Sequence, residues 1–114
     1  MAEKENIITK TYDLLLYMIP QLSKLPRDHK FLIGDRIENL LLDFLESMIE
    51  AYYSRDKLGL LAKGNLQLER LRYLVRLVFD LKLINGHRYE LICTQVNEIG
   101  AMLGGWKKAI SVKT

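Results

Sequence analysis

Residues 33–53 read IGDRIENLLLDFLESMIEAYY, and this stretch decides the fold of the chain. Its apolar side chains recur every three or four residues, which places them on one side of an α-helix. They are Ile33, Ile37, Leu40, Leu41, Phe44, Met48 and Tyr52. The opposite side is polar, with Asp35, Asn39, Asp43, Glu46 and Glu50. This amphipathic pattern predicts a helix over about residues 29–53 that packs its apolar side against other elements.

Three further segments repeat this spacing, and we expect helices over about residues 7–23, 58–83 and 87–108 as well. In the first of them, Pro20 should kink the helix or end its regular part, because proline lacks an N–H and clashes with the preceding turn. Asp28 is suited to cap the second helix, and Asn85 is suited to cap the last one. The apolar stripe of the first helix is expected to be Ile8, Tyr12, Leu15, Leu16, Ile19 and Leu22.

The connections between these helices are short, and no segment has the alternation of a strand. Four long helices with short connections predict an all-α, antiparallel up-down four-helix bundle. The length of 114 residues fits one domain, residues 1–114, and a hydrophobic content of 49% supplies the material for a core.

The helix over about 58–83 has two apolar sides rather than one. The first consists of Leu61, Leu68, Leu71, Val75, Val78 and Phe79. The second consists of Leu66, Tyr73, Leu74, Leu77 and Leu81. Three companion helices in one bundle can cover only one side. The second side is therefore predicted to face a neighbouring copy of the chain, so that the protein is a homo-oligomer.

The composition of the chain indicates the cellular compartment in which we expect it to act. The chain has no run of 18 or more apolar residues, so we expect no membrane-spanning segment. The polar start of the chain does not resemble a secretory signal. The single cysteine, Cys93, excludes a disulfide within the chain. Together these features favour the cytoplasm.

Charge is distributed unevenly along the chain. Residues 1–50 carry six Lys/Arg and nine Asp/Glu, whereas residues 51–114 carry eleven and five. A basic second half suggests an anionic partner, with nucleic acid first in line. Ordinary charge scatter on a solvated surface explains the same numbers and is favoured by charge alone.

Motifs for catalysis are missing. The two histidines, His29 and His87, are far apart in the sequence, and no Glu stands three residues before either, as a di-iron bundle would require. One cysteine cannot build a zinc site, and no phosphate-binding loop or nucleophile elbow occurs. Cys93 is better explained as a small packed side chain than as a nucleophile. We therefore expect no catalytic residue, no metal and no cofactor.

The basic residues of the third helix allow two interpretations. Arg72 and Arg76 share one stripe with Glu69 and Asp80, so each arginine could form an intrahelical ion pair worth a few tenths of a kcal/mol. Alternatively, the two guanidinium groups could bind phosphates or the carboxylates of a partner. Spacing alone favours the ion pairs. Lys63 and Arg70, on a different stripe, are further candidates for the same role.

Several short motifs occur together in a fixed order. They are Tyr12-Asp13-Leu14-Leu15-Leu16, Leu25-Pro26-Arg27 with His29-Lys30-Phe31, Gly34-Asp35-Arg36-Ile37, Leu68-Glu69-Arg70-Leu71-Arg72 with Arg76-Leu77, and Glu98-Ile99-Gly100-Ala101-Met102-Leu103-Gly104-Gly105-Trp106. In this order they resemble the accessory variability determinant (Avd) proteins of diversity-generating retroelements, within the bacterial four-helix-bundle protein family. The resemblance covers about residues 8–109.

The resemblance implies a function that the residues do not show by themselves. Members of the family are four-helix bundles that assemble as pentameric barrels. They bind the reverse transcriptase of the retroelement and nucleic acid, as RNA or an RNA/DNA hybrid, and they support error-rich copying of a template RNA. They are not enzymes. The family's partner contacts on the third helix would fall by position on Arg72 and Arg76.

A second interpretation remains open. Relatives encoded within intervening sequences of large-subunit ribosomal RNA genes share the fold and have no established activity. On that interpretation the chain is a structural or interaction protein without a nucleic-acid ligand, and its basic residues are all paired with acids.

Overall fold

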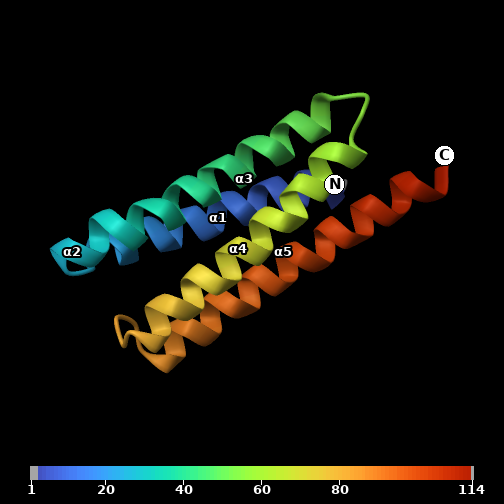
Figure 1. The fold of residues 1–114 in the computed structure, drawn as a ribbon. Coiled ribbons are helices and arrows are strands. Elements are labelled where there is room, and N and C mark those ends of the chain that lie inside the picture. The colour runs from blue at the N-terminus through green and yellow to red at the C-terminus, as the bar shows by residue number, and fades with distance from the viewer. Residues whose placement is uncertain (1–2, 114) are drawn as a thin grey trace.

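The computed structural model describes residues 3–113, and these residues form four long helical segments joined by short connections. Figure 1 shows that successive segments run in opposite directions, so that the two chain ends lie at the same end of the bundle. The segments are α1 (Glu3–Ser23), the run of α2 (Arg27–His29), η1 (Lys30–Gly34) and α3 (Asp35–Tyr53), then α4 (Leu58–Asp80) and α5 (Gly86–Lys113). The predicted all-α fold is confirmed for these residues, which include no strand.

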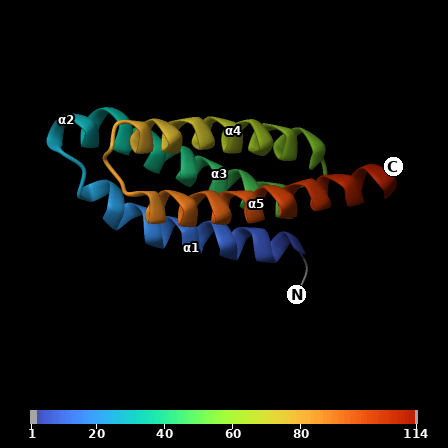
Figure 2. The same cartoon turned by 90° about the horizontal axis from the view of Figure 1, so that it is seen from below.

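The four segments surround one core and give an elongated molecule of 47 × 23 × 21 Å. Helix α1 packs beside α3 and α5, and α4 packs beside the same two helices (Figure 2). Helices α1 and α4 therefore occupy opposite corners of the bundle, as α3 and α5 do. This arrangement leaves the outer sides of α1 and α4 facing in opposite directions.

The core explains why the predicted helices pack as they do. Phe44 and Met48 of α3 are fully buried against α4. The two helices approach closely at Gly64, where an added Cβ atom would lie 2.6 Å from Met48 Cε and 3.2 Å from Phe44 Cε1. A larger residue at this position would force the Met48 and Phe44 side chains to shift, because core side chains are close-packed.

Helix α1 differs from the prediction in two ways. It begins at Glu3, one turn before the predicted start near residue 7, although it ends at Ser23 as predicted, with Pro20 inside its last turn. Its apolar stripe is also split. Leu15 and Leu22 are buried as predicted, whereas Tyr12, Leu16 and Ile19 are exposed. The predicted single stripe was wrong, because α3 and α5 cover only one side of this corner helix.

The second helical segment begins at Arg27, before the predicted start near residue 29. Pro26 occupies the N-cap position with an extended backbone, and no side chain caps the helix. The predicted cap, Asp28, lies instead in the first turn, where its carboxylate suits the positive end of the helix dipole. The turn Lys30–Gly34 is a π-helix, so the chain is helical from Arg27 to Tyr53.

Helix α4 ends at Asp80, earlier than the predicted end near residue 83. The cause is Lys82, whose φ of 62° turns the chain out of the helix. The N–H of Leu83 then donates to the carbonyl of Val78, as in a Schellman motif. The predicted cap of α5 is confirmed, because Asn85 Oδ1 accepts a hydrogen bond of 2.8 Å from the N–H of Arg88.

Helix α5 extends to Lys113, beyond the predicted end near residue 108. Ile110 is half-buried against the core, which gives these last turns a packing partner. Closer to the middle of the helix, Glu98 accepts a hydrogen bond of 2.6 Å from Lys10 of α1. This contact ties α5 to α1, and the carboxylate raises the pKa of the Lys10 ammonium.

Candidate functional site

Helix α4 carries all four basic residues that the sequence singled out, and it presents them on two different sides. Its predicted buried side is confirmed for Leu61, Leu68, Leu71, Val75 and Val78, whereas Phe79 is only half-buried. On one flank, Arg72 and Arg76 lie beside α5. On the other flank, Arg70 lies beside α3. The fold therefore does not gather the predicted residues into one patch.

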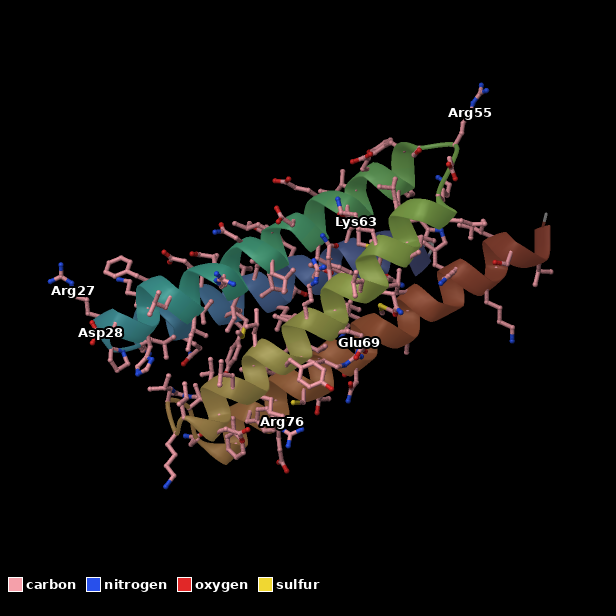
Figure 3. The ribbon with its side chains drawn as sticks, in the orientation of Figure 1. Arg27, Asp28, Arg55, Lys63, Glu69 and Arg76 are labelled. Carbon is pink, nitrogen blue, oxygen red and sulfur yellow. The ribbon has the colours of Figure 1, made fainter. Side chains whose placement is uncertain are left out.

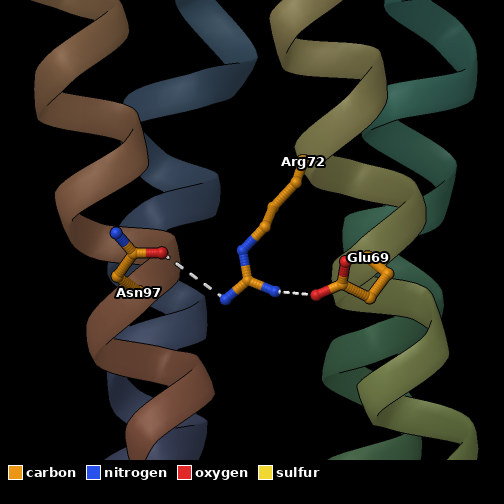
Figure 4. Close-up of polar contacts among 3 residues, drawn as sticks. All are labelled: Glu69, Arg72 and Asn97. Carbon is orange, nitrogen blue, oxygen red and sulfur yellow. Dashed lines mark hydrogen bonds and ion pairs between the residues drawn. The ribbon is translucent and has the colours of Figure 1, made fainter.

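Arg72 bridges α4 and α5 (Figure 4). Its Nη1 forms an ion pair with Glu69 of the same helix, and its Nη2 lies 3.5 Å from Asn97 Oδ1 of α5. The guanidinium rests against Gly100, where an added Cβ atom would lie only 2.8 Å from Nη2. Its side chain is 34% exposed, so Arg72 is held in place and still reaches solvent.

Arg76 is held less firmly. Its Nε lies 3.6 Å from Asp80 Oδ2, and its side chain is 65% exposed. Figure 3 shows it projecting from the bundle away from Lys63. The two predicted intrahelical pairs are thus confirmed. Exposed pairs of this kind contribute between nothing and about 1 kcal/mol, so they do not prevent either arginine from binding a stronger anion.

A groove runs between α4 and α5 at these arginines, with a volume of about 270 Å³. We call it the α4–α5 groove. Its lining is part charged and part apolar, since buried core side chains reach its floor. It is lined by Glu69, Arg72, Tyr73, Val75, Arg76, Tyr89, Ile92, Cys93, Val96 and Asn97.

Tyr89, an aromatic residue in the lining of the α4–α5 groove, is held in place by neighbouring side chains. Tyr89 stacks on Phe79 with ring centroids 4.3 Å apart and planes 7° apart. A hydrogen bond with Cys93, together with burial, raises the pKa of the Tyr89 hydroxyl. Cys93 is half-buried and lines the groove, so it is more open to the surface than a purely packed side chain.

The other flank of α4 has a different character. Arg70 lines a wider groove between α3 and α4 with Arg36 and Tyr73, of about 550 Å³. Lys63 and Arg70 are both exposed, and neither has an ion-pair partner among residues 6–112, whose side chains the structure describes. This flank adjoins the second apolar side that the sequence predicted, and that side is exposed. Its exposed members are Leu66, Tyr73, Leu77 and Leu81.

A family model described as bAvd-like matches residues 6–110. The chain belongs to the bAvd-like family. The resemblance inferred from the short motifs is thereby confirmed. No significant match to a curated protein was found. The range shared with the bAvd-like family contains both grooves and all four predicted basic residues.

Across the described part of the chain, no three His, Cys, Asp or Glu side chains lie close enough together to hold a metal ion. None of the helices over residues 3–113 is long and apolar enough to cross a membrane. Charged, aromatic and apolar groups of this bAvd-like chain converge in the α4–α5 groove, as they also do in the wider groove between α3 and α4.

The sequence missed this groove, although it identified two of its residues. Asn97 and Gly100 are more than two dozen positions from Arg72, so spacing within one helix could not connect them. The only signal was that glycine, as at Gly100 and Gly104, is disfavoured within a helix and therefore suggests close packing. At Gly100 the approaching group is the Arg72 side chain, and at Gly104 nothing within the chain comes within 4 Å of an added Cβ.

Proposed function

We propose that this bAvd-like chain is a non-catalytic accessory protein of a diversity-generating retroelement. It acts in the cytoplasm, where it binds the reverse transcriptase and RNA or an RNA/DNA hybrid and supports mutagenic copying of the template repeat. The observation that carries the proposal is the family match over residues 6–110.

The proposed contacts to nucleic acid or reverse transcriptase are Arg72, Arg76, Arg70 and Lys63. Guanidinium groups suit phosphate oxygens because they donate paired hydrogen bonds as well as charge. Contacts of this kind position a strand without reading its bases. Binding should therefore show little sequence preference and weaken steeply as salt is added.

Self-association is the third part of the proposal. The exposed apolar side of α4 lies at one corner of the bundle, and the exposed Tyr12, Leu16 and Ile19 of α1 lie at the opposite corner. Two different apolar faces on opposite sides favour a head-to-tail contact between copies, which closes into a ring when the rotation is suitable. The resemblance to Avd proteins implies a ring of five.

Two measurements test the proposal. Co-expression with the reverse transcriptase encoded beside this gene should give a complex that survives size-exclusion chromatography. RNA affinity should fall by orders of magnitude between about 50 and 200 mM salt if six or more phosphates are contacted. A chain that forms no complex and binds RNA without salt dependence does not have this function.

A second candidate is a structural or interaction protein without a nucleic-acid ligand. One observation favours it: Arg72 and Arg76 already have acidic partners in Glu69 and Asp80. Lys63 and Arg70 speak against it, because among the described residues neither has such a partner. An oligomer that forms normally but binds neither RNA nor reverse transcriptase would support this second candidate.

A further inference from the structure

The α4–α5 groove combines features that no single helix face provides. Arg72 and Arg76 stand one turn apart on its edge, about 6 Å along the helix axis. Its floor is apolar, because the core residues Val75, Ile92 and Val96 reach it. At about 270 Å³ the groove is near the lower end of the size of small-molecule sites. It has room for a flat ring that carries one anionic group.

The position of Arg72 depends on α5. Gly100 leaves the space that the guanidinium occupies, since a Cβ atom there would lie 2.8 Å from Nη2. Asn97 and Glu69 each hold one end of the guanidinium. An arginine has five N–H donors, so further donors remain for an oxygen ligand. Gly100 is therefore a positioning residue for Arg72.

Arg76 complements Arg72 because its guanidinium can readily exchange its present acidic partner for a ligand. Its ion pair with Asp80 is long, at 3.6 Å, and exposed, so exchanging the carboxylate for a phosphate costs little. Phosphate accepts paired hydrogen bonds from arginine and carries more charge than one carboxylate. The two arginines can thus hold one phosphate group at the edge of the groove.

The groove also offers an aromatic surface for a base. Phe79, which does not line the groove, covers Tyr89 from one side and holds its ring. Tyr89 itself lines the groove together with the apolar floor. A rigid ring beside buried aliphatic groups favours stacking or edge contact with another flat ring.

We propose that the α4–α5 groove receives one unpaired nucleotide of a single strand, with its phosphate on Arg72 and Arg76 and its base against Tyr89. The proposal rests on the proposed nucleic-acid function for the identity of the polymer. It adds that the protein prefers single-stranded segments. A paired base lies inside its helix and cannot enter the groove, so a duplex offers only its phosphates.

The test uses the full chain and a single-stranded RNA that carries one 2-aminopurine, whose fluorescence falls when the base stacks. Binding should quench the probe in the single strand and leave it unchanged in the annealed duplex. Tyr89→Leu should weaken binding by about five- to a hundredfold and abolish the quench. Tyr89→Phe keeps the ring and should retain the quench. Tyr53→Leu removes an exposed tyrosine at the far end of α3 and is the matched control.

A glycine pair tests the placement of Arg72 independently. Gly100→Ala should displace the guanidinium and reduce single-strand affinity severalfold. Gly104→Ala, one turn further along α5, meets nothing within 4 Å and should leave affinity unchanged. Both variants gain helix propensity, so misfolding does not explain a loss confined to Gly100→Ala. Equal effects of the two variants would overturn the role of Gly100.

The outcomes separate this inference from the function on which it rests. Salt-sensitive RNA binding with equal affinity for single strand and duplex, unaffected by Tyr89→Leu, overturns the nucleotide site and leaves the proposed function standing. Loss of reverse transcriptase binding but not of RNA binding in Tyr89→Leu also overturns it, because the groove then receives a protein side chain. The absence of any RNA binding by the unaltered chain overturns both.

Discussion

The two flanks of α4 carry the same residue types but differ in what surrounds them. Beside α5, Arg72 and Arg76 each have an acidic partner, and Arg72 is fitted against the backbone of a neighbouring helix. On the flank toward α3, Arg70 and Lys63 have no ion-pair partner in the part of the chain that the structure describes. They stand among exposed apolar side chains.

This difference shows that having an acidic partner and being available to bind a ligand are separate properties of a basic side chain. The paired arginines lie over the α4–α5 groove, whereas Arg70 lines the wider groove toward α3, and both Arg70 and Lys63 stand beside exposed apolar side chains that suit a broad apolar contact. Exposed ion pairs are weak, so a partner acid does not disqualify an arginine from binding. We therefore propose that nucleic acid binds on the α5 flank and that the outer apolar side of α4 makes protein contacts.

The largest expected effect is on the association of copies through the outer apolar side of α4. Leu77→Asp places a charge within the exposed apolar face of α4, which we propose to be buried between copies. Central interface residues contribute about 2 kcal/mol or more, so the dissociation constant of the oligomer should rise at least about thirtyfold. Light scattering at micromolar concentration measures this. Asn65→Asp adds the same charge at an exposed position on the polar stripe of Glu69 and serves as the control. An unaltered chain that is monomeric contradicts the assignment.

The next effect distinguishes the two flanks directly. Arg72→Gln combined with Arg76→Gln removes two proposed phosphate contacts, which should flatten the slope of log affinity against log salt by about 1.4 for a single strand. Lys63→Gln combined with Arg70→Gln removes the same charge and should affect reverse transcriptase binding or assembly instead. Fluorescence anisotropy at several salt concentrations compares the pairs. The reverse ranking would move the nucleic acid to the outer side.

A smaller effect concerns stability on the α5 flank. Gly104→Ala should raise the free energy of unfolding by up to about 1 kcal/mol, because glycine is disfavoured within a helix. Gly100→Ala should gain less, since the displaced Arg72 loses its hydrogen bond to Asn97. Urea unfolding of both variants gives the difference. A larger gain for Gly100→Ala would mean that Arg72 was not held there.

The smallest effect tests the ion pair of Arg76. Asp80→Asn removes an exposed contact of 3.6 Å and should change the free energy of unfolding by less than about 0.5 kcal/mol. Asp80 also lies at the end of α4, where a negative charge opposes the helix dipole, which reduces any loss further. RNA affinity should rise slightly because Arg76 is released. A measurable fall in affinity would show that Asp80 orients Arg76 for binding.

Local sequence spacing predicted the features that a single helix determines. The pairs Glu69–Arg72 and Arg76–Asp80 were expected from their separation, and both are present. The Asn85 cap was expected for the same reason, because its bond spans one turn. The buried side of α4 also followed from periodicity alone. The end of α4 did not, because the left-handed conformation of Lys82 is rare for a residue other than glycine.

Only the tertiary structure decided the contacts between residues of different helices. The sequence by itself determined that the chain is helical, which side of α4 enters the core and which basic residues have acids within reach, since these depend on the fixed pitch of the helix. The packing of four helices decided that Gly100 faces Arg72, that Tyr12 and Leu16 of α1 remain outside, and that a groove opens beside Tyr89. These contacts join residues far apart in the chain, so they arise only when the helices adopt one relative rotation and distance.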